Sequence, residues 1–317
     1  MNRIRETQAH DPGALPVRDR YGLLVGTVAP RPIALASTVD AEGRRNLAPF
    51  SYFNVFSIDP PMLMVGPTLR GRDGTVKDTL ANARFTGEIV INLVDHAMVE
   101  GTSLSSSDYP ADVDEFAKAG FTPVDSDTVG PARVGEAPVA FECAVSQILE
   151  LGDGPGAGHT LVCKVKRVHI AEDVLGADGK PDAHAIDLVG RCGGNFYVRA
   201  SGEALFEIPK PTGAGLGVGV DALPEEVRDT GRLSLNESAR LGAAREIPDE
   251  TEVNEHKLIE LSNLFMEHED DPTALEAALF AEARQRLEQG DVDGAWKTLL
   301  AYNPGCRTGG RYSPYEL

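Results

Sequence analysis

The sequence contains few cysteines, and they form no cluster. Its 317 residues include four, Cys143, Cys163, Cys192 and Cys306, which lie far apart and make no CxxC pair. Such spacing fits neither a zinc ribbon nor the disulfide framework of a small secreted protein. We therefore expect reduced thiols, and we interpret Cys143, Cys163 and Cys192 as small residues of strands or turns rather than redox centres.

Long apolar segments are missing as well. No run of hydrophobic residues approaches the length that a membrane-spanning helix needs. The opening residues, MNRIRETQAHDPG, are polar and lack the hydrophobic core of a signal peptide. We expect a cytoplasmic protein that does not bind a membrane.

Positive charge is scarce. The chain has 30 Lys and Arg residues against 49 Asp and Glu residues, so its formal net charge is −19. A chain this acidic repels phosphate backbones and anionic lipid surfaces, which argues against nucleic acid and membranes as partners. The charge is uneven, because 21 acidic and 10 basic residues lie between Asp221 and Leu317, which gives this final third −11 of the total.

Several common catalytic and ligand-binding motifs are absent. The sequence has neither a GxxxxGK[ST] phosphate loop nor a GxSxG nucleophile motif. Its glycine-rich residues 213–219 alternate as GxGxGxG behind Pro209 and Pro211, and we interpret them as a linker rather than a dinucleotide-binding turn. His256 and His268 lie twelve residues apart, so we do not expect them to share a metal ion, and no metal site is predicted.

What the sequence does contain, up to about residue 205, is a series of short β-like runs without regular helices between them. The clearest runs are 33–39, 62–65, 88–94, 141–151 and 159–170. This arrangement predicts a mainly β (α+β) domain built as a barrel or sandwich, with a hairpin loop at residues 152–158. Two short helices are expected within it, at 75–84 and 114–120.

The residues after the linker have helical periodicity instead. One helix is expected over 252–269, where five apolar residues would share a face: Val253, Leu258, Leu261, Leu264 and Phe265. A helical hairpin is expected from Pro272 to about Gln289 and from Ala295 to Leu300. The sequence therefore predicts two domains, residues 1–212 and an acidic helical extension of residues 213–317.

Residues 30–79 are the most informative part of the chain for function. A strand is followed by a turn at Gly43, and Pro49 makes the next segment, 46–54, too broken for a regular strand ladder. Its free backbone N–H groups and short hydroxyls suit the edge of a planar heteroaromatic ligand. Lys77 and Thr79, at the start of an expected helix, favour a phosphate group. A capped helix with a surface lysine explains the same two residues equally well.

Five short segments of this region follow one another in a familiar order. They are RPIALAST (31–38), DAEG (40–43), NLAPFSYFN (46–54), DPP (59–61) and KDT (77–79). Together they resemble the flavin reductase-like family, the FMN-binding split barrels. Further along, Gly152-Asp153 with His159 resembles the family's strand pair around a GD…H loop, and residues 187–197 resemble its closing segment. The resemblance covers roughly residues 15–205.

This resemblance implies a six-stranded Greek-key split barrel that binds FMN non-covalently, with FAD as an alternative. It also implies a homodimer with the flavin near the subunit interface. It places Ser37 and Thr38 beside the flavin and Lys77, Asp78 and Thr79 at its phosphate end, assisted by Arg31. The isoalloxazine edge and ribityl chain would be contacted largely through backbone groups of Ala48, Pro49, Phe50 and Ser51, with Asn54.

The function that the resemblance implies is an FMN-dependent NAD(P)H oxidoreductase of flavin reductase type. Hydride would pass from NAD(P)H to bound flavin, and then to free flavin, a partner monooxygenase or a small acceptor. His159 matches the family histidine near the nicotinamide and is the candidate catalytic residue, although the glycine-rich residues 154–158 separate it from Gly152-Asp153. Arg191 and Tyr197 match the closing segment without an assigned role.

Two other classes of function remain as alternatives. One is an FMN-binding protein without NAD(P)H turnover: a carrier, an electron-transfer module or a sensor. The other is an interaction scaffold in which the acidic helical extension is a docking arm. The sequence favours a packed helical appendage with a solvated acidic face for this extension.

Overall fold

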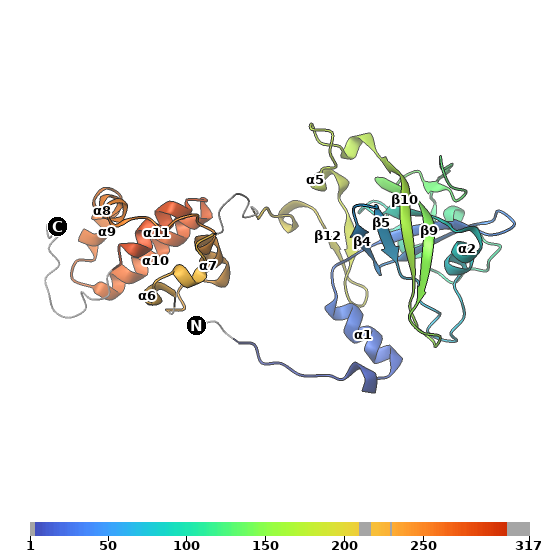
Figure 1. Ribbon diagram of the computed structural model, residues 1–317, viewed down its shortest axis with the longest axis horizontal. Helices are drawn as coiled ribbons and strands as arrows, with labels where there is room; N and C mark the ends of the chain where they lie inside the picture. The colour runs from blue at the N-terminus through green and yellow to red at the C-terminus, as the bar shows by residue number, and fades with distance from the viewer. Residues whose placement is uncertain (1–3, 209–216, 229, 303–317) are drawn as a thin grey trace. The chain divides into compact units, whose positions relative to one another are not determined.

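The structure is a computed structural model that describes residues 4–208, 217–228 and 230–302 (Figure 1). The chain divides into two compact units. One, the barrel unit, comprises Ala9–Glu207; the other, the helical unit, comprises Ile208–Leu317 together with Met1–Gln8. The predicted boundary at residues 212 and 213 lies outside the described residues, as does most of the glycine-rich stretch 213–219.

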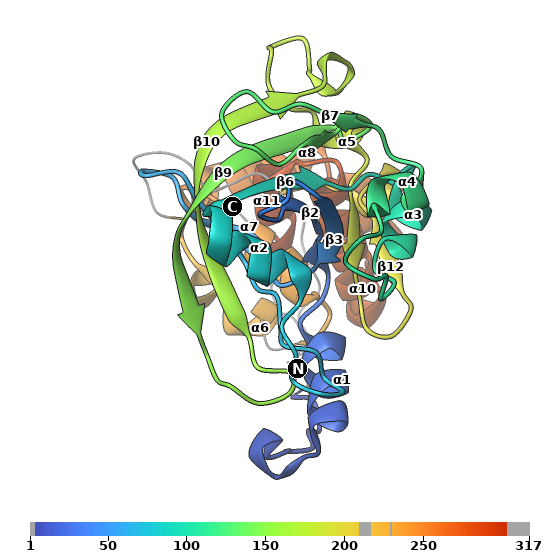
Figure 2. The ribbon, with the colours of Figure 1, turned by 90° about the vertical axis from the view of Figure 1, so that its right-hand side faces the viewer.

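The main sheet of the barrel unit is antiparallel, with strand order β3-β2-β6-β9-β10-β5-β4. The strands are β2 (Ala34–Val39), β3 (Arg45–Phe50), β4 (Phe53–Ser57), β5 (Met62–Val65), β6 (Glu88–Leu93), β9 (Val139–Glu150) and β10 (His159–Ile170). Only Ser51 and Tyr52 separate β3 from β4, yet these strands occupy opposite edges of the sheet. The two edges must therefore approach each other, and the sheet curls into a half-barrel (Figure 2). This sheet has seven strands, so the six-stranded count that the family resemblance implied is not confirmed.

The segment containing Pro49 corrects one prediction. Residues 45–50 form a regular ladder with β2, in which Pro49 lies opposite Leu35. Proline is tolerated because β3 is an edge strand, where a missing N–H on the outer side removes no ladder hydrogen bond. The outer side of β3 still has groups available to other partners, since the Leu47 N–H donates to Glu115 Oε2 at 3.1 Å.

Both faces of strand β2 are buried. Ala34 and Ala36 pack into a cluster with Leu80 and Ala83 of α2 (Asp78–Thr86). Leu35 on the other face packs with Met98 and Phe116. Met98 directly precedes α3 (Val99–Leu104), and Phe116 belongs to α4 (Glu115–Ala119). Figure 2 shows α2 on one side of β2 and β3, and α3 and α4 on the other. The sheet is therefore held between two apolar layers.

Smaller elements complete the barrel unit. A second sheet joins β1 (Arg31–Pro32), β11 (Val189–Arg191) and β12 (Tyr197–Arg199), and a short hairpin joins β7 (Pro123–Val124) to β8 (Arg133–Val134). The remaining helices are α1 (Val17–Thr27) and α5 (Ala183–Ile186), with 3₁₀ turns at Pro12–Ala14, Glu172–Val174 and Gly202–Ala204. The expected helix at 114–120 is confirmed: the Asp114 side chain accepts from Phe116 N–H, and Gly120 ends the helix at φ 77°.

The helical unit contains a 3₁₀ turn at Val220–Ala222 and six helices in its described part. These are α6 (Glu225–Arg228), α7 (Leu235–Gly242), α8 (Glu250–Ile259), α9 (Ser262–Glu267), α10 (Pro272–Glu288) and α11 (Val292–Leu300). The predicted hairpin of α10 and α11 is confirmed, with Gly290 at φ 82° between them. Trp296 of α11 is fully buried in the core of the helical unit, and the Trp296 Nε1–H donates to the Leu241 carbonyl at 2.9 Å.

The single helix predicted over 252–269 is wrong. The chain turns between Ile259 and Ser262, so α8 and α9 are separate helices. Leu261 is buried after the turn, whereas Leu258 is 58% exposed and leaves the predicted apolar face. Within the described ranges, no helix is long and apolar enough to cross a membrane.

Candidate functional site

The first of two regions of interest is a pocket of about 110 Å³ at the start of α2. It is lined by the end of β3, by the first residues of α2 and by the segment 105–109. Six residues predicted from the sequence meet here: Ala48, Pro49, Phe50, Lys77, Asp78 and Thr79. The fold thus brings the NLAPF and KDT segments together, although nearly thirty residues separate them along the chain.

Lys77 supplies an unusual positive charge to this pocket. It precedes the first turn of α2, and its Nζ lies 5.3 Å from the centre of the Phe50 ring. Burial, followed by the nearby positive charge of Arg70, lowers the pKa of Lys77. An anion placed beside Lys77 would reverse that effect, and the first N–H groups of a helix have no partners within the helix. The donor set therefore suits a phosphate group.

A buried hydrogen-bonded cluster lies under the same pocket. Asn46 donates through Nδ2 to Thr38 Oγ1 at 3.1 Å and to Thr79 Oγ1 at 2.9 Å. Asn82 of α2 also donates to Thr38 Oγ1, at 3.1 Å. Ser37 and Thr38 are fully buried and line neither of the two regions, and the Ser37 Oγ has no hydrogen-bond partner. These residues connect β2, β3 and α2 beneath the pocket.

Some pocket residues were missed by sequence reasoning. Arg70 binds Asp78 at 3.2 Å and Asp108 at 3.3 Å, and so ties the preceding loop to α2. Glu115 is a buried carboxyl group whose pKa is raised by burial. Residues 105–107 are three consecutive serines beside Asp108, the signal that could have drawn attention to this segment.

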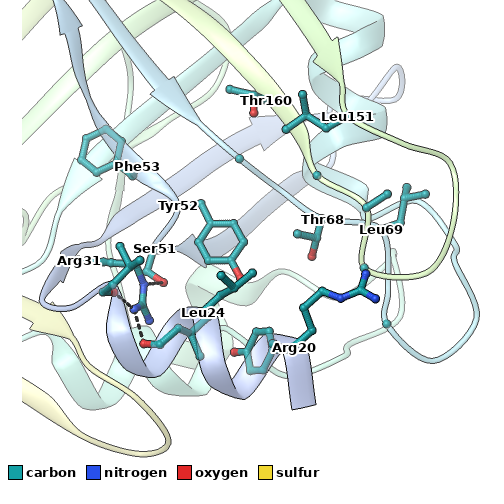
Figure 3. Close-up of a pocket in the computed structure, with 18 of the residues that line it drawn as sticks. Arg20, Leu24, Arg31, Ser51, Tyr52, Phe53, Thr68, Leu69, Leu151 and Thr160 are labelled. Carbon is teal, nitrogen blue, oxygen red and sulfur yellow. Dashed lines mark hydrogen bonds between the residues drawn. The ribbon is translucent and has the colours of Figure 1, made fainter. Parts of the chain in front are cut away.

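The second region is a cavity of about 1200 Å³ (Figure 3). Its walls are α1, the start of β4, residues 66–71 and the loop between β9 and β10. Arg31, Ser51 and Asn54, predicted to bind the cofactor, line this cavity rather than the pocket at α2. Figure 3 shows Leu24 and Tyr52 on one side, and Leu69 and Leu151 on the other.

The charge of the cavity contrasts with that of the whole chain. Its lining includes Arg18, Arg20 and Arg31, and no carboxylate appears among its described lining residues. Its other side chains are mostly aromatic or aliphatic, including Tyr21, Tyr52, Phe53, Phe56, Met64 and Leu69. A chain of net charge −19 therefore carries a locally basic, largely apolar cavity that suits a planar anion.

Arg31 holds one corner of this cavity. Its guanidinium is buried and donates to the Val25 carbonyl at 2.6 Å and to the Val28 carbonyl. It also donates to Ser51 Oγ at 3.3 Å, a contact that Figure 3 shows. Carbonyl groups at the C-terminal end of a helix favour a cation. Arg31 thereby fixes the end of α1 against the start of β4.

The other residues singled out in the sequence line neither region. His159 is 5% exposed and lines neither. Arg191 and Tyr197 pair across β11 and β12, with the guanidinium 4.6 Å from the ring centre, and line a separate hollow of about 430 Å³. Burial raises the pKa of Cys143, and raises that of Cys163 to about 12. Cys306 lies outside the described residues.

Comparison with known proteins identifies the family. Residues 26–184 match the family described as "Flavin reductase like domain". The chain belongs to the flavin reductase-like family. An uncharacterized protein of Aquifex aeolicus is 35% identical over 188 residues, which is 59% of this chain and 93% of that protein. An uncharacterized protein of Halalkalibacterium halodurans is 36% identical over 204 residues, 64% of this chain and 96% of that protein.

Solved structures of similar fold agree with this assignment. Nitrilotriacetate monooxygenase component B from Bacillus cereus is 31% identical with a TM-score of 0.60, over 65% of this chain and 100% of that one. The 2-nitrobenzoate 2-nitroreductase NbaA of Pseudomonas fluorescens is 28% identical with a TM-score of 0.57, over 64% of this chain and 97% of that one. A Shewanella frigidimarina protein described as having a split barrel domain shares the fold. It is 24% identical with a TM-score of 0.54, over 62% of this chain and 95% of that one.

Proposed function

We propose that this flavin reductase-like protein is an FMN-dependent NAD(P)H oxidoreductase. The observation that carries the proposal is the meeting of Lys77, Thr79 and the first turn of α2 with β3 in one pocket. The lining of this pocket continues along the chain into that of a basic and apolar cavity, from Phe50 to Ser51. Such a pair of sites can hold a phosphate at one end and planar rings at the other. Membership of the flavin reductase-like family is the reason for naming a flavin as the ligand.

Within this proposal, the phosphate end of FMN lies at the pocket of α2. Lys77 supplies the charge, and Asp78 and Thr79 supply N–H groups at the helix start. The edge strand β3 offers backbone groups at Ala48, Pro49 and Phe50 for the isoalloxazine edge and ribityl chain, and Ser51 and Asn54 continue this surface into the cavity. Ser37 and Thr38 support the site from beneath.

The cavity then receives the nicotinamide and the acceptor. Bound FMN would supply the redox chemistry by accepting a hydride and passing electrons on. The protein contributes orientation: Tyr21, Leu24 and Tyr52 restrict the rings and exclude water. Arg18 lines the cavity and favours the phosphates of a dinucleotide.

Two acceptors are supported by the similar structures. One of these proteins is a component of a monooxygenase and another is a nitroreductase. We propose that reduced flavin is delivered to a partner monooxygenase, or that a small acceptor is reduced in the cavity. A homodimer is proposed too, because Tyr21, Leu24, Val55 and Phe56 of α1 and β4 leave apolar side chains exposed beside the cavity. We place the protein in the cytoplasm.

The deciding experiment is the absorption spectrum of the purified protein, followed by anaerobic mixing with NADH and with NADPH. We expect a yellow protein, or one that becomes yellow on titration with FMN, whose flavin band bleaches with one nicotinamide. Colourless protein that takes up no FMN contradicts flavin binding. Flavin that stays oxidised with both nicotinamides leaves only a carrier, an electron-transfer module or a sensor.

A further inference from the structure

His159 stands at the start of β10, immediately after the glycine-rich loop that lines the cavity. Both ring nitrogens are engaged: Nδ1 lies 3.1 Å from Arg84 Nη2, and Nε2 lies 3.1 Å from the Gly152 carbonyl oxygen. A guanidinium group can only donate, so Nδ1 accepts and Nε2–H donates to Gly152. These contacts leave neither ring nitrogen free for a substrate.

Arg84 connects this ring to helix α2. It lies in the last turn of α2, whose first turn lines the phosphate pocket. The same Nη2 forms an ion pair with Glu150 Oε1 at 2.6 Å, at the end of β9. Arg84 and His159 thus join α2, the end of β9 and the loop that follows it.

The loop held in this way forms one wall of the cavity. Residues 154–158 line it, and the Ala157 carbonyl accepts from Leu69 N–H at 2.9 Å. Gly156, at φ 82°, faces Val17 of α1, and an added Cβ would lie in van der Waals contact with Val17 Cγ1 at 3.4 Å. In Figure 2 the long hairpin of β9 and β10 descends toward α1. Four of residues 152–158 are glycines, which gain the most freedom when unconstrained.

We propose that His159 is a positioning residue that fixes loop 152–158 as a wall of the cavity and so sets the fit of the nicotinamide substrate. It acts through its Nε2–H bond to Gly152, not by transferring a proton. This inference rests on the proposed function only in naming the nicotinamide as the ligand of the cavity. The anchoring of the loop stands on the contacts of His159 alone.

Two substitutions separate positioning from proton transfer. In His159→Gln the side-chain amide can reach the place of Nε2 and donate to Gly152, whereas in His159→Asn it reaches only the place of Nδ1. We expect His159→Asn to raise the KM for NAD(P)H about five- to tenfold, the effect of one lost hydrogen bond, with kcat little changed. His159→Gln should restore the KM. Neither amide can transfer a proton, so a large loss of kcat in both variants would overturn the proposal.

A second measurement needs no turnover. Hydrogen exchange of the amides in residues 151–158 should accelerate in His159→Asn, and should stay as in the unmodified protein in His159→Gln. Arg84→Gln, which removes the other anchor of the ring, should act in the same direction. His184→Asn changes an exposed histidine of the same unit and serves as the control. If neither nicotinamide reduces the flavin, the proposed reaction fails, but hydrogen exchange still tests the anchoring of loop 152–158. Unchanged hydrogen exchange in both His159→Asn and Arg84→Gln overturns the anchoring role.

Discussion

Lys77 and Thr79 are the side chains whose roles can be separated from simple helix capping. Lys77 makes no side-chain cap bond to α2, and Thr79 Oγ1 accepts from Asn46. A surface lysine in a capped helix would be exposed, but Lys77 is half-buried above Phe50, where burial lowers its pKa. This placement favours the phosphate interpretation over the alternative that the sequence left open.

Replacing both side chains should therefore weaken FMN retention. For Lys77→Met with Thr79→Val we expect a rise in the dissociation constant of FMN of roughly tenfold or more, because a charged hydrogen bond contributes about 1.5–3 kcal/mol. Fluorescence titration of FMN measures this directly. Lys118→Met, on the exposed side of α4, is the control. Unchanged affinity in the double variant removes both residues from the phosphate site.

Glu142 is a second residue whose chemistry is set by its surroundings. It is fully buried on β9, and it accepts from Asp127 N–H at 2.8 Å, from His169 Nε2 at 2.6 Å and from the N–H and hydroxyl of Thr128. Asp127, Glu142 and His169 lie close enough to resemble a metal site. Four hydrogen bonds already satisfy Glu142, so its role is to tie the 127–128 loop to the sheet.

Acid should weaken the barrel unit through this carboxylate. Burial alone would raise the pKa of Glu142, but the bonds from Thr128, Asp127 and His169 outweigh it and lower the pKa to about 2. The folded pKa lies below the unfolded value of 4.5, so the stabilisation is complete above pH 4.5 and is lost as pH falls toward 2. Its size is about 3 kcal/mol. Urea unfolding followed by circular dichroism from pH 7 to pH 3 measures it.

The matched variant Glu142→Gln should lose this stabilisation at pH 7. The difference in free energy of unfolding between this variant and the unmodified protein should shrink at pH 3, because the carboxyl group of the unfolded state is then protonated. Glu203→Gln, at an exposed position, should behave as the unmodified protein does. An equal difference in free energy of unfolding between Glu142→Gln and the unmodified protein at both pH values contradicts a lowered pKa of Glu142.

At the scale of elements, α8 is attached to α11 by a buried histidine. His256 Nε2 lies 3.0 Å from Thr298 Oγ1, whose hydroxyl donates to the Gly294 carbonyl at 2.8 Å. Thr298 must therefore accept, and His256 donates through Nε2–H. Burial, followed by Arg286, lowers the pKa of His256. The charged groups around it are Arg286, Glu260, Lys297 and Asp291.

The helical unit should consequently become less stable below neutral pH. Because the folded pKa of His256 lies below the unfolded value of 6.5, the unfolded state binds the proton more readily, and stability falls as pH drops through 6.5. Trp296 is the single tryptophan of the chain, so its fluorescence follows urea unfolding of this unit alone. We expect a lower midpoint at pH 5 than at pH 8. His256→Gln should abolish the difference and His268→Gln should keep it.

Elements differ in how far local sequence determines them. The predicted strands at 141–151 and 159–170 match β9 and β10 closely, because both long runs end at the same glycine-rich loop. Helix α1 was missed because it has two glycines, Gly22 and Gly26, and buries only Val25. Its position depends on Arg31, which follows it and binds its last carbonyls. Such a helix is specified by tertiary contacts that periodicity does not reveal.

In the candidate site, too, some residues could be predicted from local sequence and others only from the folded structure. Lys77 and Thr79 were predictable because charge, hydroxyl and helix start are adjacent in sequence. Arg70, Glu115 and the serines at 105–107 were not, since only folding brings their segments to the pocket. Arg31 was predicted to assist at the phosphate end, and only the folded structure shows that it lines the cavity instead.

For the whole molecule, the proposed chemistry lies in one unit. Every residue lining the pocket at α2 and the cavity belongs to Ala9–Glu207. Component B of the Bacillus cereus enzyme is matched over 100% of its length by only 65% of this chain. We expect a chain that ends at Glu207 to bind FMN within about twofold of the full-length affinity, a difference below 0.5 kcal/mol.

Titration of FMN into the shortened chain measures this, with anaerobic reduction by NAD(P)H as the second readout. Equal affinity and equal rate would confine the chemistry to the barrel unit and leave the acidic helices for another task. A marked loss of either would show that the helical unit contributes to the site, and would contradict a simple appendage.

The burial of Trp296 in the helical unit also gives the molecule two chromophores, one in each unit, once FMN is bound. Tryptophan emits where oxidised flavin absorbs, so excitation of Trp296 should pass to the flavin with an efficiency that depends on their separation. With FMN bound as proposed, the intact chain would carry its own donor and acceptor for resonance energy transfer. No label is needed to follow how far the acidic helices stand from the flavin during turnover.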